Sequence, residues 1–199
     1  MTNTDICNMA LSFLSKGRIK SMTEENREEA KQCQTHYENC RRLLLRTYPW
    51  GFARRKVQLA RLDATFPGWA FVYRYPKNCL SIAYIYDEAQ AYERIAQKQR
   101  FETALLDAES RVILTDVEDA WAEYCYNVTD VDLFPPEFAE ALAHKLASAM
   151  ALALTGSDAL MQREYQLFQG MLDVAKSQDA QEKERKLVWE TAYAEARFS

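Results

Sequence analysis

The sequence predicts an α+β fold that is mainly α: a helical bundle with an antiparallel β insertion between its second and third helices and an extended or helical C-terminal tail. Amphipathic helical patterns occupy residues 1–52 and 134–176, and strand-like runs separated by turn residues occupy 53–133. Helices near both ends of the chain must cover one another's apolar stripes, so we expect them to form one bundle. Residues 177–199 are predicted to be the tail.

Two helices are expected before the strands. Thr4 or Asp5 can cap the first, and Gly17 is expected to end it. The second is expected to start at Thr23 and to stop before Pro49, with acidic residues at its start and arginines near its end, as the helix dipole favours. Its inward stripe is predicted to be Ala30, Cys33, Tyr37, Cys40 and Leu44, with Leu43 as a further candidate.

The middle of the chain carries strand signals. Runs rich in β-branched and aromatic residues are separated by turn residues, and Asp107–Ser110 is typical of a hairpin turn. The expected strands are 57–62, 70–75, 80–86, 101–106, 111–115 and 124–128. Residues 87–99 are polar and are compatible with either a loop or a short helix.

Two further helices follow the strands. Pro135 and Pro136 open the third, because a proline at a helix start lacks an N–H that would be unpaired there anyway. Gly156 is expected to end it, and Ser157 with Asp158 to cap the fourth. Beyond Lys176 the chain turns polar and charged, so we expect the fourth helix to end near that point.

The net charge of −4 is unevenly spread along the chain. Residues 1–75 hold 13 Lys and Arg against 7 Asp and Glu, whereas residues 76–199 hold 12 against 22. This asymmetry predicts complementary surfaces, on which the basic part of one copy faces the acidic part of the next. The alternative is two solvated faces without a partner.

The five cysteines show no pairing pattern, which favours a reduced, cytoplasmic folding environment. Cys33, His36 and Cys40 lie on roughly one side of the second helix, where Cys7 could add a fourth metal ligand. Their spacing matches no standard zinc signature, so we interpret the thiols as small buried apolar groups and expect neither a metal nor a cofactor. The longest apolar run, 147–154, is too short to span a bilayer, and no membrane partner is expected.

Catalytic signatures are weak. A chain with 5 Gly and 2 His carries no phosphate-binding loop and no recognisable Ser-His-Asp arrangement. The carboxylates of Asp116, Glu118 and Asp119 follow a strand and could supply the acid pair of a glycan hydrolase. Acidic loops are far commoner than such pairs, so we expect a protein without enzymatic activity and keep the glycan hydrolase as the alternative.

A basic segment follows the second helix. Arg54–Lys56, together with Arg61, Arg74 and nearby aromatic residues, could contact nucleic acid. The segment alternates like a strand in a chain with a sequence pI of about 5.4, so we interpret it as a strand first. Trp50 and Phe52 are interpreted as core residues at the corner between helix and strand.

The C-terminal tail is a candidate partner-binding segment. The apolar residues Leu187, Val188, Trp189, Tyr193 and Phe198 follow a stretch that is polar on every face. Such a stretch could not hold them against the protein's own core. We therefore expect the tail to dock into a partner, with Trp189 and Tyr193 as anchors four residues apart. The alternative is a lone C-terminal helix that folds back on the bundle.

Four stretches carry a resemblance to a known family: Glu28–Cys33, Pro49–Ala53, Tyr75–Leu80 and Phe138–Ala147. With the order of helices and strands, they make the chain similar to the tail adaptor proteins of short-tailed bacteriophages, the tail tubular protein A type. The corner Pro49–Ala53 and the alanine-rich helix are the more specific of these matches.

The resemblance implies a structural virion protein. Such proteins form a ring of about twelve copies beneath the portal of a filled head, retain the packaged double-stranded DNA and pass it during ejection, and support the tail nozzle. The implied partners are therefore the portal protein, the nozzle protein and further copies of the chain, in the virion tail after assembly in the host cytoplasm. Without this resemblance, the chain is interpreted as a generic soluble helical interaction domain.

Overall fold

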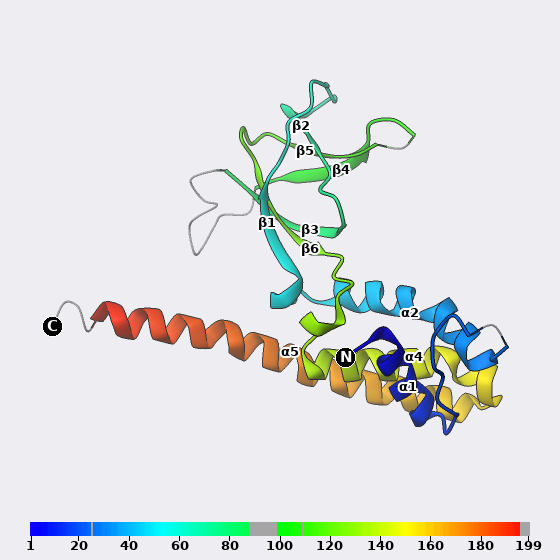
Figure 1. The fold of residues 1–199 in the computed structure, drawn as a ribbon. Helices are drawn as coiled ribbons and strands as arrows, with labels where there is room; N and C mark the ends of the chain where they lie inside the picture. The colour runs from blue at the N-terminus through cyan, green and yellow to red at the C-terminus, as the bar shows by residue number, and fades with distance from the viewer. Residues whose placement is uncertain (25, 88–98, 109, 196–199) are drawn as a thin grey trace. The chain divides into compact units, whose positions relative to one another are not determined.

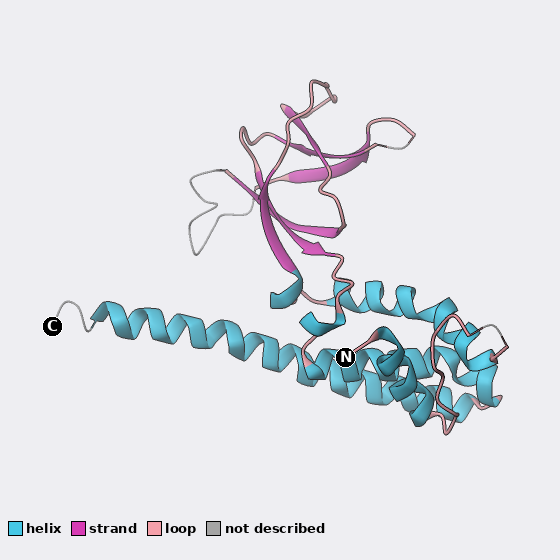
Figure 2. Cartoon of the chain, viewed as in Figure 1, coloured by secondary structure: helices cyan, strands magenta, loops and turns pink. Residues whose placement is uncertain are grey.

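The chain forms two compact units in a computed structural model that describes residues 1–199 apart from 25, 88–98, 109 and 196–199. The helical unit consists of Met1–Phe52 and Val128–Ser199, and the β unit consists of Ala53–Asn127. Figures 1 and 2 show the helices and the strands of these units. Side chains from residue 183 onwards also lie outside the described part.

The predicted helical bundle with a single β insertion is wrong. The described residues form a mixed structure of four α-helices and two three-stranded antiparallel sheets. The strands bury their apolar side chains in a core of their own, which contains Leu59, Tyr73, Ile85, Ile113, Ala120 and Ala122. The β part is therefore a separate unit with its own packing and not an addition to a helical core.

Helix α1 (Asn3–Phe13) has Thr2 as its N-cap, two residues before the predicted cap Thr4 and three before Asp5. The hydroxyl of Thr2 accepts the backbone N–H of Asp5 at 3.2 Å, and the Asp5 carboxylate accepts the N–H of Thr2 at 2.8 Å. This reciprocal pair is a capping box, in which Asp5 stands at the third helical position and not at the cap. The helix ends at Phe13 with Leu14 as its C-cap, before Gly17, and Ser15 takes a left-handed φ of 56°.

Helix α2 (Glu28–Thr47) begins later than the predicted Thr23. The carboxylate of Glu24 accepts the N–H of Lys20 at 3.1 Å, and the hydroxyl of Ser21 accepts the N–H of Thr23 at 3.1 Å. These side chains pair with loop backbone, which favours a turn over a helix. The predicted stripe of Ala30, Cys33, Tyr37, Cys40 and Leu44 is buried, whereas Leu43 is 46% exposed and does not belong to it.

Helix α4 (Pro136–Thr155) packs against α1, α2 and α5. Its start at Pro136 and its end at Gly156, which has a left-handed φ of 67°, are confirmed. The inward face includes small side chains that allow neighbouring helices to approach closely. The buried alanines of this helix are Ala139, Ala141, Ala143, Ala147 and Ala151.

Helix α5 (Asp158–Glu195) begins as predicted but does not end near Lys176. The Ser157 hydroxyl accepts the N–H of Leu160 at 3.2 Å, which satisfies one of the free donors at the helix start. A polar segment continues as helix because alanine, glutamine, glutamate, lysine and arginine all favour that conformation. In Figure 1, α5 extends past the other helices of its unit.

Four rings form an aromatic corner, consisting of Trp50, Phe52, Phe134 and Phe138. The Phe138 ring centroid lies 5.2 Å from that of Trp50 and 4.9 Å from those of Phe52 and Phe134. Trp50 is 1% exposed and its indole N–H donates to the Leu44 carbonyl at 3.0 Å. The 3₁₀ turns η1 (Gly51–Ala53) and η2 (Val131–Leu133) lie next to these rings along the chain.

Polar contacts that are buried or partly buried fix the helical unit. The Gly51 N–H donates to the Asp179 carboxylate at 2.6 Å. The fully buried Arg41 guanidinium donates to the Val128 carbonyl and to Glu38. On α4, the His144 ring is 2.7 Å from the Glu164 carboxylate of α5 and stacks on the Phe13 ring of α1, with the two centroids 4.1 Å apart.

The β unit contains two sheets. The first has the order β1 (Arg54–Gln58), β6 (Trp121–Tyr126), β3 (Cys79–Tyr86). The second has the order β2 (Phe71–Arg74), β5 (Arg111–Thr115), β4 (Phe101–Leu105). All pairings are antiparallel, and the predicted hairpin is confirmed as β4 and β5.

The strands β1 and β6 differ most from their predicted bounds. β1 and β6 each begin three residues earlier than expected, because their mutual register runs from Arg54 opposite Cys125 to Gln58 opposite Trp121. Most of the segment 87–99, for which loop and helix stayed open, lies outside the described residues.

We expect Phe138→Ala to lower the free energy of unfolding by about 3–5 kcal/mol, since it removes the ring that touches all three other members of the aromatic corner. Denaturant unfolding measures this change. The matched control is Leu152→Ala on the same helix, where the side chain is 52% exposed and a change within about 0.5 kcal/mol is expected. Equal effects of the two substitutions would contradict this account of the corner.

Candidate functional site

The predicted tail-docking residues fall mostly within α5. Its helical backbone runs through Leu187, Val188, Trp189 and Tyr193 and ends at Glu195. Phe198 lies outside the described residues, as do the side chains of the other four. The last buried position described on this helix is Asp179, and Gln181 and Glu182 are exposed.

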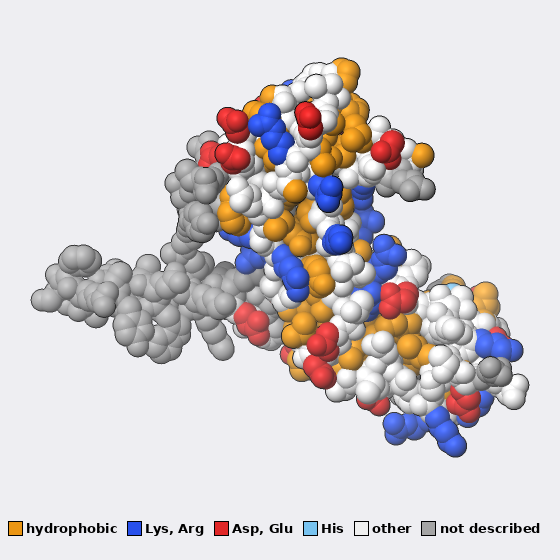
Figure 3. All heavy atoms as spheres, turned by 45° about the horizontal axis from the view of Figure 1, so that its top comes forward, with side chains coloured by type: hydrophobic (Ala, Val, Ile, Leu, Met, Phe, Trp, Pro, Cys, Tyr) orange, Lys and Arg blue, Asp and Glu red, His pale blue; other side chains and the backbone are white. Residues whose placement is uncertain are grey.

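The charge asymmetry along the chain does not follow the two structural units. Residues 53–127 hold ten Lys and Arg against eleven Asp and Glu, so the β unit is close to neutral overall. On the face drawn in Figure 3, basic and acidic side chains are interspersed with hydrophobic ones. Any electrostatic recognition must therefore come from a local arrangement of charges and not from a charged half of the molecule.

The cysteines considered as metal ligands lie in the helical core. Cys7, Cys33 and Cys40 are buried free thiols, and the Cys33 sulfur lies 3.7 Å from the sulfur of Met150. A hydrogen bond between the thiols of Cys7 and Cys33, together with burial, raises the pKa of Cys7, which keeps that thiol protonated. In the described part of the chain, no group of three or more His, Cys, Asp or Glu side chains could hold a metal ion.

The carboxylates considered for glycan hydrolysis lie in the turn between β5 and β6. Asp116 accepts the N–H of Ala70 at 3.0 Å, and the exposed Glu118 lies 3.6 Å from Arg61. Asp119 takes a left-handed φ of 51°. None of these three carboxylates lines the groove beside β1, described below, or the small pocket next to Trp50 and Phe138.

The basic strand β1 presents its cations to two different environments. Arg54 and Lys56 lie 3.3 Å and 3.8 Å from the carboxylate of Glu123 on the neighbouring strand β6. Glu123 is 5% exposed and also accepts the hydroxyl of Tyr86 at 2.8 Å. These two cations are thus partly neutralised by a buried carboxylate that belongs to the framework of the sheet.

Arg55 and Val57 alternate with these residues and therefore lie on the other side of β1. That side borders a groove of about 380 Å³. Arg74 at the end of β2 and Lys77 in the loop after it add two cations to the lining, and Asn78 in the same loop adds a polar amide. The lining residues are Arg55, Val57, Gln58, Leu59, Ala60, Arg74, Tyr75, Pro76, Lys77, Asn78, Tyr124 and Tyr126. We call this site the β1 groove.

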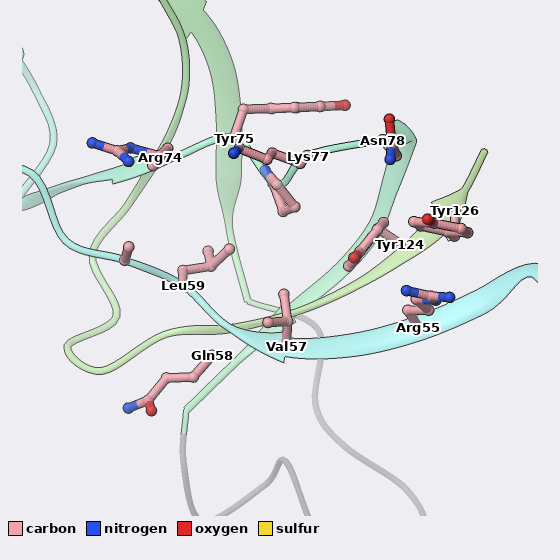
Figure 4. Close-up of a pocket in the computed structure, with 12 residues that line it drawn as sticks. Arg55, Val57, Gln58, Leu59, Arg74, Tyr75, Lys77, Asn78, Tyr124 and Tyr126 are labelled. Atoms are coloured by element: carbon pink, nitrogen blue, oxygen red, sulfur yellow. The ribbon is translucent and has the colours of Figure 1, made fainter. Parts of the chain in front are cut away.

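Figure 4 shows how the β1 groove is built. Val57 points from β1 toward the segment that carries Tyr75 and Lys77, and Tyr124 lies between Val57 and Tyr126 in this view. The Arg55 guanidinium lies 3.5 Å from the centroid of the Tyr126 ring, so an aromatic ring holds this cation in position.

A second cation is stacked beside the groove. The Arg111 guanidinium lies 4.2 Å from the centroid of the Tyr75 ring. Among the described residues, no carboxylate lies within ion-pair distance of Arg55, Arg74 or Lys77, and none lines the groove. The groove therefore combines uncompensated positive charge with aromatic surface, a combination that attracts anions.

Part of this site was predicted from the sequence. Arg55 and Arg74 belong to the basic residues considered for nucleic-acid contact, but the prediction did not separate them from Arg54 and Lys56. The alternation of β1 could have made that separation, because residues two apart share a face. The contributions of Lys77 and Tyr126 depend on strand pairing and loop folding, and no local signal in the sequence reports them.

Comparisons with known proteins do not assign a function. No family model matches the sequence, and a search among curated proteins gives no match. Within the described residues, none of the helices combines the length and the apolar composition needed to cross a membrane.

Glu123→Ala should lower the free energy of unfolding by about 2–4 kcal/mol, since it leaves the buried Tyr86 hydroxyl without its acceptor and two cations without their counter-charge. Thermal or denaturant unfolding gives the value. Glu118→Ala is the control: it removes a carboxylate that is 69% exposed, and surface ion pairs contribute at most about 1 kcal/mol. A loss for Glu123→Ala no larger than for the control would contradict a framework role.

Alkaline pH should destabilise the protein. Burial raises the pKa of Tyr37, Tyr73, Tyr86 and Tyr124 above the ordinary tyrosine value of about 10. Below that pH both states keep these protons; above it the unfolded chain releases them first, so stability is lost as the pH rises. Each proton released in excess by the unfolded chain changes the free energy by about 1.4 kcal/mol per pH unit.

Urea unfolding measured from about pH 8 to pH 11 tests this dependence. Tyr124→Phe keeps the ring and removes one ionisable hydroxyl, so its stability should fall less steeply with pH. An unchanged slope for this variant would show that Tyr124 does not take part.

Proposed function

We propose that this chain is the tail adaptor of a short-tailed bacteriophage. It acts as a structural component without enzymatic activity, and it joins the portal of the filled head to the tail nozzle in a ring of about twelve copies. In that position it helps to retain the packaged DNA and to pass it during ejection. The protein belongs to the virion tail and assembles in the host cytoplasm.

The observation that carries this proposal is the length of α5. This helix has 38 residues and its partner α4 has 20, which correspond to about 57 Å and 30 Å at 1.5 Å per residue. Glu164, Phe168, Ala175 and Asp179 are buried on its first part. Sixteen helical residues follow Asp179, more than four turns.

A helix that extends beyond the helix it packs against can contact another protein with its remaining turns. Trp189 and Tyr193 lie four residues apart in that last part, a spacing that places them one turn apart along the helix. Aromatic residues at this spacing are typical anchors of helices that bind in grooves. The resemblance to tail adaptor proteins makes the portal the partner that we propose for this segment, and further copies of the chain the partners within the ring.

The other candidate functions have less support. Asp116 and Glu118 are engaged with the N–H of Ala70 and with Arg61, which suits turn residues better than an acid pair across a substrate groove. A generic helical interaction domain would share the long α5 but would have no preference for a portal.

Mixing the purified chain with isolated portal particles tests the adaptor function. The full chain should form a ring at portal stoichiometry, with mass and symmetry determined by native mass spectrometry and electron microscopy. Deleting Leu187–Ser199 should abolish the complex. Trp189→Ala combined with Tyr193→Ala should weaken it by about a hundredfold or more, since interface anchors contribute about 2 kcal/mol or more each.

The matched control replaces two exposed apolar residues elsewhere. Leu105 and Leu106 are 64% and 38% exposed in the β unit, and Leu105→Ala with Leu106→Ala should leave portal binding unchanged. A chain that stays monomeric with portal particles would overturn the proposal. Loss of turnover on a glycan substrate after Asp116→Ala would instead establish the hydrolase.

A further inference from the structure

The cations near β1 fall into two groups. Some lie close to carboxylates of the β unit, and others line the β1 groove without such a carboxylate. Arg54 and Lys56 pair with Glu123, and Arg61 lies near Glu118 and 4.5 Å from the Phe71 ring centroid. In the part of the chain that the structure describes, Arg55, Arg74 and Lys77 have no such carboxylate. Three cations without counter-charges around one cavity favour an anionic occupant.

Arginine geometry narrows the chemistry of that occupant. A guanidinium presents a planar fork of donors that matches a phosphate, and stacking on a ring holds the fork in a fixed orientation before binding. Arg55 on Tyr126 meets this condition inside the groove, and Arg111 on Tyr75 meets it beside the groove. Less side-chain entropy is lost on binding when the donors are already ordered.

The rest of the lining distinguishes a nucleic acid from an acidic peptide. Tyr75 and Tyr126 are half-buried, and each carries a stacked guanidinium. Nucleobases stack on such guanidinium planes and on aromatic rings regardless of sequence. The Asn78 amide can donate to and accept from a base edge. An acidic peptide would use the cations but has no planar base to add to these arginine–tyrosine stacks.

The binding mode also disfavours a peptide strand. β1 is an edge strand, and a peptide that extends the sheet would pair with its outer backbone edge. The groove instead lies over side chains of β1 and β6, where Val57 and Tyr124 form its lower surface. Its volume of about 380 Å³ is near the lower end of the range of about 300–1,000 Å³ for ligand sites.

We propose that the β1 groove binds single-stranded nucleic acid, with Arg55, Arg74 and Lys77 on the phosphates and with bases against Tyr75 and Tyr126. A duplex hides the faces of its bases, so it can use the cations of the site but not the rings. This activity is separate from the adaptor function, and each can fail without the other.

Fluorescence anisotropy with a labelled oligothymidine of about 20 nucleotides tests the proposal, since this length exceeds a site of roughly 4–16 nucleotides. The variant is Arg55→Gln with Arg74→Gln and Lys77→Gln in the full-length chain. Its affinity should fall by about tenfold or more, and the slope of log K against log salt should decrease by about 2, as expected when three phosphate contacts of a single strand are lost.

The matched control removes the same charge from exposed positions on α2, through Lys31→Gln with Arg42→Gln and Arg46→Gln. It should keep the affinity and the salt slope of the unmodified chain. Tyr126→Leu, which keeps the three cations and removes the ring, should weaken binding to the oligothymidine. Circular dichroism and thermal unfolding verify that each variant is folded.

Three results would overturn the proposal. The first is an oligothymidine affinity that is absent, or that falls equally in the groove and control variants. The second is tighter binding of a duplex of the same length, which would show a site for the paired backbone. The third is binding of a poly-glutamate peptide without binding of the oligothymidine, which would assign the groove to an acidic protein segment.

Discussion

The aromatic corner is the contact on which the helical unit depends. This unit is made of two chain segments separated by the 75 residues of 53–127, and bringing such distant segments together costs loop-closure entropy. Trp50 and Phe52 come from the first segment, and Phe134 and Phe138 come from the second. Their mutual burial offsets that cost at the place where the chain leaves and re-enters the unit.

Polar contacts add specificity to this apolar packing. Arg41 donates to the Val128 carbonyl at the start of the returning segment, and Asp179 accepts the Gly51 N–H at the corner. Glu164 and His144 join α5 to α4. Each contact is buried or partly buried, so a shifted register would leave a polar group without its partner and would be disfavoured. These polar contacts therefore favour one arrangement of the helices over others that would bury a similar apolar area.

Local patterns predicted the elements better than their assembly. The buried stripe of α2, the Pro136 start and Gly156 end of α4, and the β4–β5 hairpin all follow from periodicity and turn chemistry within a few residues. The start of α2 was missed because Glu24 and Ser21 bond to loop backbone. The partition into two sheets was missed because strand pairing is a long-range choice that an alternating pattern does not encode. The β1 groove shows the same limit, since Lys77 and Tyr126 join Arg55 only through that pairing.

The pairing of β1 with β6 has a further consequence. Arg54 lies opposite Cys125, so the strand that enters the β unit and the strand that leaves it are neighbours. A unit whose two ends lie side by side interrupts its host chain with little strain, and a short connection could take its place. The β unit therefore has the geometry of an inserted domain. It could be exchanged, enlarged or removed, in evolution or in the laboratory, while the helices keep their own packing.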